Sequence, residues 1–218
     1  MKIRESLVKA YLRLPRNPRK GEGVINIACI GDSVTRGAGV MGRRDQTWEY
    51  YLNEKLGDDY RVINCGISGC TLQKQADCPY VESSLYPSTL KLKADIYLVM
   101  LGSNDTKTAN WNEERYEREL KDFLKGYLTL DNSPRIIVMI PPECFPYNEA
   151  GDVAYSIDKH LVDNVLPGII RKTAGKLDIE LIDLLEPTRG HEEWYVDGVH
   201  PNAEGNRQIA EVIAAHLR

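Results

Sequence analysis

Five short apolar runs that alternate with helix-like segments constrain the fold of this chain more than any other feature. The runs are rich in β-branched residues and are typical of buried strands: VINIACI (24–30), YRVINCG (60–66), ADIYLVMLG (94–102), RIIVMIPP (135–142) and IELIDL (179–184). Segments of helical character lie among and after them, at 45–57, 111–130, 155–176 and 202–217. Strands that alternate with helices form parallel βαβ units, so the sequence predicts an α/β fold. We expect a three-layer α/β/α sandwich whose five-stranded parallel sheet has the flavodoxin-like order 2-1-3-4-5.

The length of the chain suits one such domain. Its 218 residues are 42% hydrophobic and 28% charged, which is an ordinary balance for a globular protein, and we expect a single domain over residues 21–218. Residues 1–20 are strongly basic and carry an apolar stripe at helical spacing: Ile3, Leu7, Tyr11 and Leu14. They predict a basic N-terminal helical extension. This helix packs on the domain or docks on a membrane or a partner, and the sequence leaves both alternatives open.

Charge and cysteine usage argue against several classes of protein. The net charge of −4 argues against a nucleic-acid partner, because phosphate binding needs clustered Lys and Arg side chains. The five cysteines form no C-x-x-C pair, so we expect free thiols, no metal site and a cytoplasmic location. No segment has the apolar run of a signal peptide or a membrane span, and we expect no membrane partner for the domain.

Polar residues suited to acyl transfer follow the predicted strands. In open α/β sheets, ligands bind beyond the carboxyl ends of the strands, near the switch in strand order. Ser33 follows the first run, and Asp197 and His200 follow the fifth. A serine hydroxyl needs a base to attack at neutral pH, so Ser33 is assigned as nucleophile, His200 as base and Asp197 as the group that orients the imidazole. Backbone N–H groups of Ser33 and Gly69, with the Asn104 side chain, are expected to form an oxyanion hole.

Four short motifs in this order resemble those of the SGNH hydrolases, also called GDSL esterases and lipases. They are GDSV (31–34), Gly69 within ISGCT, GSND (102–105) and DGVHP (197–201). The resemblance covers nearly the whole predicted domain. It implies acyl-ester hydrolysis by the residues assigned above, with no metal and no organic cofactor. Two positions depart from the family pattern, since Val34 replaces the usual leucine and Cys70 stands where many relatives have an acidic residue.

The expected reaction is serine-dependent hydrolysis of a small carboxylic ester. The sequence has no apolar lid-like segment, which favours a small acyl group, such as acetyl, on a carbohydrate or another small alcohol. Arg36, Trp194 and Tyr195 are candidate substrate-binding residues, although the two aromatic side chains equally suit core packing. A lipase or lysophospholipase, a thioesterase and an acyltransferase use the same triad and remain alternatives. A non-catalytic binding module is the alternative from a different class, and the oligomeric state stays open.

Overall fold

A five-stranded parallel sheet organises the molecule, as the sequence predicts. The computed structural model describes residues 23–218, so the prediction of a basic helix at 1–20 lies outside the described residues. The strands are β1 (Ile25–Gly31), β2 (Tyr60–Gly66), β3 (Ile96–Met100), β4 (Arg135–Ile140) and β5 (Glu180–Asp183). Their order in the sheet is β2-β1-β3-β4-β5, which confirms the flavodoxin-like arrangement.

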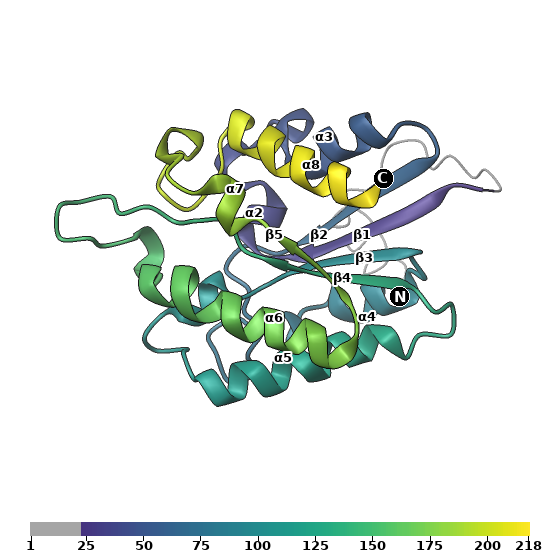
Figure 1. Cartoon of the computed structure of the whole chain (residues 1–218), viewed down its shortest axis with the longest axis horizontal. Helices are drawn as coiled ribbons and strands as arrows, with labels where there is room; N and C mark the ends of the chain where they lie inside the picture. The colour runs from purple at the N-terminus through teal and green to yellow at the C-terminus, as the bar shows by residue number, and fades with distance from the viewer. Residues whose placement is uncertain (1–22) are drawn as a thin grey trace.

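Helices cover both faces of the sheet and make the three layers (Figure 1). Their bounds are α2 (Ser33–Arg36), α3 (Trp48–Leu56), α4 (Tyr86–Lys91), α5 (Glu113–Leu128), α6 (Leu166–Leu177), α7 (Leu185–Thr188) and α8 (Ala203–Leu217). Helices α3 and α8 lie on one face, whereas α5 and α6 lie on the other. Among the described residues, no helix is both long and apolar enough to cross a membrane.

The central strands are buried on both faces, which explains their continuous apolar sequence. Along β3, Tyr97 and Val99 join the core beneath α5 and α6, whereas Leu98 and Met100 join the core beneath α3 and α8. Successive strand residues point to opposite faces, so a strand covered on both sides has no polar alternation.

The helix expected at 155–176 begins later than the sequence predicts. Tyr155 and Ser156 have positive φ angles of 62° and 59°, and a right-handed helix cannot include such residues. A π-helical turn at Leu161–Val165 leads into α6 instead. Pro167 lies in the first turn of α6, where its missing N–H costs least. The non-helical stretch leaves Tyr155 in a loop, where it contacts other parts of the molecule.

Asn206 ties the C-terminal helix to the segments around it. This buried side chain of α8 accepts a hydrogen bond from the Trp48 N–H at 3.1 Å, at the start of α3. Its Nδ2 donates to the carbonyl oxygens of Pro201 and Asn202, at 2.9 Å each. Asn206 therefore holds the turn before α8 against α3.

We predict that Asn206→Ala lowers the free energy of unfolding by about 2 kcal/mol, because it leaves the buried Trp48 N–H and the Pro201 carbonyl without their partner. Urea unfolding with an unchanged m-value would measure the loss. Gln208→Ala on the same helix is the control and should change stability by less than about 0.5 kcal/mol. Equal stability of the two variants would contradict this role for Asn206.

Candidate active site

Ser33 is presented by a tight turn at the carboxyl end of β1. Asp32 caps the short helix α2, since its Oδ1 accepts the Val34 N–H at 3.0 Å. The Asn64 side chain, from the end of β2, donates to the Thr35 carbonyl oxygen at 2.6 Å. Hydrogen bonds from both ends of α2 thus hold Ser33 at the first helical position, at the edge of the sheet.

Ser33, His200 and Asp197 form a continuous hydrogen-bonded series. The Ser33 Oγ lies 2.8 Å from His200 Nε2, and His200 Nδ1 lies 2.7 Å from Asp197 Oδ2. An ionised carboxylate can only accept, so the ring proton is assigned to Nδ1 and the Ser33 hydroxyl donates to Nε2. Ser33 and His200 are only 8% and 7% exposed, which shields the hydrogen bond between them from bulk water. The structure therefore brings together all three residues assigned as the triad.

The turn that carries Asp197 and His200 is shaped by the carboxylate itself. Asp197 Oδ1 accepts the N–H groups of Val199 and His200 at 3.0 and 2.8 Å. Gly198 has a φ of +79°, and a side chain there would overlap the Phe145 carbonyl oxygen. Burial opposes ionisation of Asp197, but the hydrogen bonds from His200 and Val199 outweigh it and lower the pKa of Asp197. Asp197 is therefore ionised at neutral pH.

Asn104 faces the same edge from the turn after β3. Its Nδ2 lies 3.3 Å from Asp32 Oδ2, and its backbone carbonyl oxygen accepts a hydrogen bond from the Asn110 side chain at 3.0 Å. The amide group has a second N–H hydrogen, which remains available for an oxyanion. Burial raises the pKa of Asp32 to about 6, although hydrogen bonds from Val34 and Asn104 oppose the shift. Asp32 therefore orients the Asn104 amide from a largely dry position.

Asp105 braces the loop that carries Gly69, a role that the sequence analysis missed. This fully buried carboxylate accepts the N–H groups of Leu72 and Gln73 at 2.9 and 2.8 Å. Burial raises the pKa of Asp105 to about 7 against these hydrogen bonds. Gly69 itself has a φ of +79°, which favours glycine. The GSND motif was the available signal, since Asp105 adjoins the predicted oxyanion residue Asn104.

The candidate substrate-binding residues lie outside the hydrogen-bonded series. Arg36 ends α2 and is half-buried. Trp194 stacks on His191 with ring centroids 3.7 Å apart. Tyr195 is 9% exposed and packs on Phe145 at 5.1 Å, as a core residue does. Their assignment to substrate binding stays a prediction.

The cysteine thiols near the site are poor nucleophiles. Burial raises the pKa of Cys65 and of Cys70, and the neighbouring Cys78 thiol, 3.3 Å from Cys70, adds to the second shift. A thiol must ionise to attack, so Ser33 remains the candidate nucleophile.

Within residues 23–218, no group of three or more His, Cys, Asp or Glu side chains is arranged to hold a metal ion.

A serine, a histidine and an aspartate in series at the carboxyl edge of a parallel sheet define the site of a serine hydrolase. The chain belongs to the GDSL-like Lipase/Acylhydrolase family, whose model matches residues 29–208. This confirms the family resemblance of the four sequence motifs.

Two curated relatives illustrate the range of activities among similar proteins. An acetylxylan esterase of Xylanibacter ruminicola is 28% identical, over 92% of this chain and 45% of its own length. The chain thus spans less than half of that relative. Thioesterase 1/protease 1/lysophospholipase L1 of Escherichia coli K12 is 26% identical, over 87% of this chain and 81% of its own length.

Solved structures share the fold. An aryl esterase of M. smegmatis superposes with a TM-score of 0.76 at 24% identity, covering 89% of this chain and 99% of that one. Est24, a carbohydrate acetylesterase from Sinorhizobium meliloti, superposes with a TM-score of 0.73 at 22% identity, covering 88% of this chain and 98% of that one. At these identities the likeness confirms the α/β fold.

We predict that Asp32 makes the protein less stable as the pH rises. Its folded pKa of about 6 lies above its usual value of 3.8, so its contribution to stability is fully present below pH 3.8 and is lost as the pH rises through 6. This loss amounts to at most about 3 kcal/mol between pH 3.8 and 7. Asp32→Asn should remove it.

Urea unfolding of both proteins at several pH values between 4 and 7.5 would measure the effect as a difference between their slopes. A difference in unfolding free energy that stays constant with pH would show that Asp32 does not titrate in this range.

Proposed function

We propose that this protein is a carboxylic ester hydrolase that works through an acyl-enzyme on Ser33. The observation that carries the proposal is the hydrogen-bonded series from Ser33 Oγ to His200 to Asp197, with distances of 2.8 and 2.7 Å. An isolated serine hydroxyl is a weak nucleophile, and a neutral imidazole within hydrogen-bonding distance is the base that activates it. Ionised Asp197 holds the imidazole ring and stabilises its protonated form.

In the first half-reaction, His200 removes the Ser33 proton as Oγ attacks the ester carbonyl. Negative charge then develops on the carbonyl oxygen, where the N–H groups of Ser33 and Gly69 and the Asn104 amide would stabilise it. His200 returns the proton to the departing alcohol. In the second half-reaction, His200 activates a water molecule, which releases the carboxylic acid from Ser33.

We propose a small acyl group, such as acetyl, and a carbohydrate alcohol as the substrate class. The acetylxylan esterase relative and the carbohydrate acetylesterase neighbour support this choice. The Escherichia coli relative supports a second candidate, a thioesterase or lysophospholipase. An acyltransferase differs only in the acceptor that replaces water. The intact triad argues against a purely non-catalytic binding module. We also propose a cytoplasmic location, from the scattered spacing of the five cysteines in the sequence.

We predict that a fluorophosphonate probe labels Ser33 and no other serine, because covalent attack requires the hydroxyl to be activated by His200. Ser33→Ala should abolish labelling and lower kcat/KM for p-nitrophenyl acetate by at least about 10⁴-fold. Mass spectrometry of the labelled peptide and steady-state kinetics would measure the two effects. The exposed Ser84→Ala variant is the control and should behave as wild type. Unchanged activity of Ser33→Ala would remove Ser33 as the nucleophile.

We also predict that kcat/KM falls as the acyl chain lengthens, from p-nitrophenyl acetate to the palmitate ester. A site for a small acyl group has no apolar groove in which a long acyl chain could be buried. Initial rates at subsaturating concentrations would give the series directly. A maximum at long chains would favour the lysophospholipase candidate over the acetylesterase.

A further inference from the structure

The loop between β4 and α6 carries a projecting arm and also brings one residue, Tyr155, to the triad. Two sections of this loop pair with each other, through a bridge between Pro146 and Val153 and a hydrogen bond from the Tyr147 N–H to the Asp152 carbonyl oxygen at 2.9 Å. The arm projects from the body of the molecule, at the left of Figure 1. Its internal pairing gives this long loop a defined shape.

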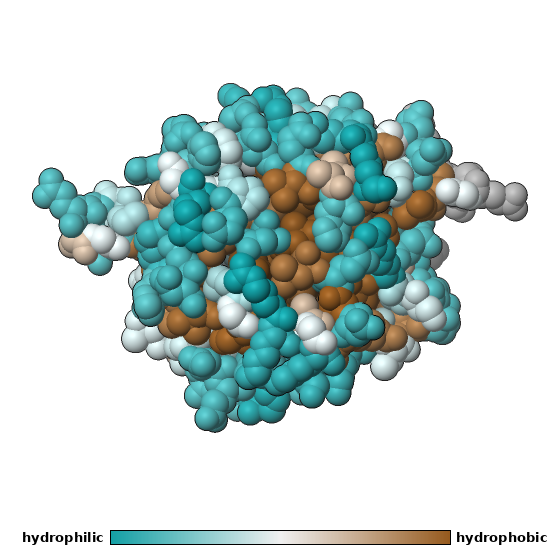
Figure 2. All heavy atoms as spheres, viewed as in Figure 1, coloured by the Kyte–Doolittle hydropathy of each residue, from teal (hydrophilic) through white to brown (hydrophobic). Residues whose placement is uncertain are grey.

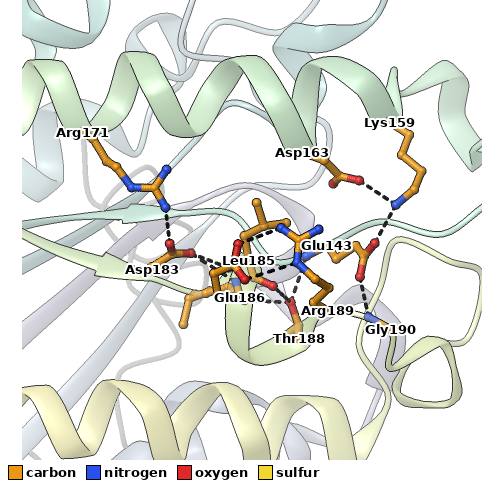
Figure 3. Close-up of polar contacts among 11 residues, drawn as sticks. Glu143, Lys159, Asp163, Arg171, Asp183, Leu185, Glu186, Thr188, Arg189 and Gly190 are labelled. Atoms are coloured by element: carbon orange, nitrogen blue, oxygen red, sulfur yellow. Dashed lines mark hydrogen bonds and ion pairs between the residues drawn. The ribbon is translucent and has the colours of Figure 1, made fainter.

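A partly buried ion cluster closes the base of this loop (Figure 3). Lys159 Nζ lies 2.8 Å from Glu143 Oε1 and 2.6 Å from Asp163 Oδ2. It also donates to the Cys144 carbonyl oxygen at 2.6 Å. The second oxygen of Glu143 accepts the Gly190 N–H at 2.6 Å. Because Glu143 and Lys159 stand at the two ends of the loop, their ion pair holds the loop closed.

Tyr155 lies within this closed loop and contacts two members of the triad. Its hydroxyl donates to Asp197 Oδ2 at 2.9 Å. Its ring meets the His200 ring edge-on, with centroids 5.1 Å apart and an interplanar angle of 66°. Tyr155 and Ser156 both have a left-handed backbone, which is costly for residues other than glycine. Strain of this kind persists only where surrounding contacts hold it, and Asp197 and His200 supply such contacts to Tyr155.

The ring of Tyr155 lies beside His200, the base of the proposed reaction. In the proposed reaction, His200 delivers a proton to the departing alcohol, so the alcohol must lie beside the His200 ring. Tyr155 adjoins that ring, and 58% of its surface remains exposed to a ligand. Its hydroxyl is already engaged by Asp197, so the ring is held in place before a substrate binds.

We propose that Tyr155 forms the subsite for the alcohol half of the ester and that a sugar ring packs on its aromatic face. This inference rests on the proposed function and names the residue that recognises the carbohydrate. Asp197 and His200 hold the Tyr155 ring in place, and the closed loop carries Tyr155.

The polar segment that precedes Tyr155 in the loop favours a sugar over an alkyl chain. The arm from Asn148 to Asp152 is exposed and mostly polar or small, and Figure 2 shows the projecting part at the left mainly in hydrophilic colours. An alkyl chain needs a continuous apolar groove. A sugar ring has one apolar C–H face, which a single aromatic ring can cover, and hydroxyl groups that suit a polar neighbourhood.

The test compares two esters with the same acetyl group and different alcohols, acetylated xylobiose and ethyl acetate. Tyr155→Ala should raise KM for the sugar ester about 10-fold and leave KM for ethyl acetate within about twofold. Tyr155→Phe keeps the ring and loses the bond to Asp197. It should keep the wild-type KM for the sugar ester and lower kcat equally on both esters. Tyr147→Ala is the matched control, since Tyr147 is 63% exposed on the same arm, and should behave as wild type.

Three results would overturn the subsite: an equal change of KM for both esters in Tyr155→Ala, no change for either, or the same change in Tyr147→Ala. If the wild-type protein hydrolyses neither ester, the proposed function fails separately. The subsite is then decided by binding of xylobiose, the alcohol product, measured by saturation-transfer NMR. Binding that Tyr155→Ala abolishes and Tyr147→Ala retains would support it, and absence of binding to the wild-type protein would overturn it.

Discussion

The hydrogen bond between Ser33 and His200 joins residues that are 167 positions apart in the chain. It forms because the parallel sheet brings the carboxyl ends of its strands to one edge, with β1 between β2 and β3. Ser33 follows β1 directly, whereas His200 arrives after β5 by way of a turn anchored to Phe145 and Asn206. Each of these supports must hold to within a fraction of an ångström, since a proton moves along this bond in the proposed reaction.

Three buried or half-buried aspartates surround this bond, and their environments give them different protonation behaviour. Asp197 receives hydrogen bonds from His200 and Val199 that lower its pKa, and it stays ionised beside the imidazole. Asp32 and Asp105 lie in drier positions, where burial raises their pKa to about 6 and about 7. The former orients Asn104, and the latter holds the Gly69 loop. One residue type thus contacts the proposed base and supports both Asn104 and the Gly69 loop of the proposed oxyanion hole.

The loop between β4 and α6 relates the fold to substrate choice. Its base is closed by Lys159 with Glu143 and Asp163. The same loop brings Tyr155 against the triad. An enzyme with this sheet can therefore change its alcohol specificity by changing this loop, without altering the strands that hold the triad.

The sequence by itself determined the sheet, its strand order and the positions of Ser33, Asn104, Asp197 and His200 after the strands. Apolar runs and short motifs are local patterns, and strand ends in a parallel sheet converge by geometry. Only the tertiary structure decided that Asp105 braces the Gly69 loop and that Tyr195 packs on Phe145. It also decided that Tyr155 meets Asp197, a contact across 42 residues from a segment that reads locally as helix. Contacts of this kind depend on how loops fold against one another, and no local periodicity records that.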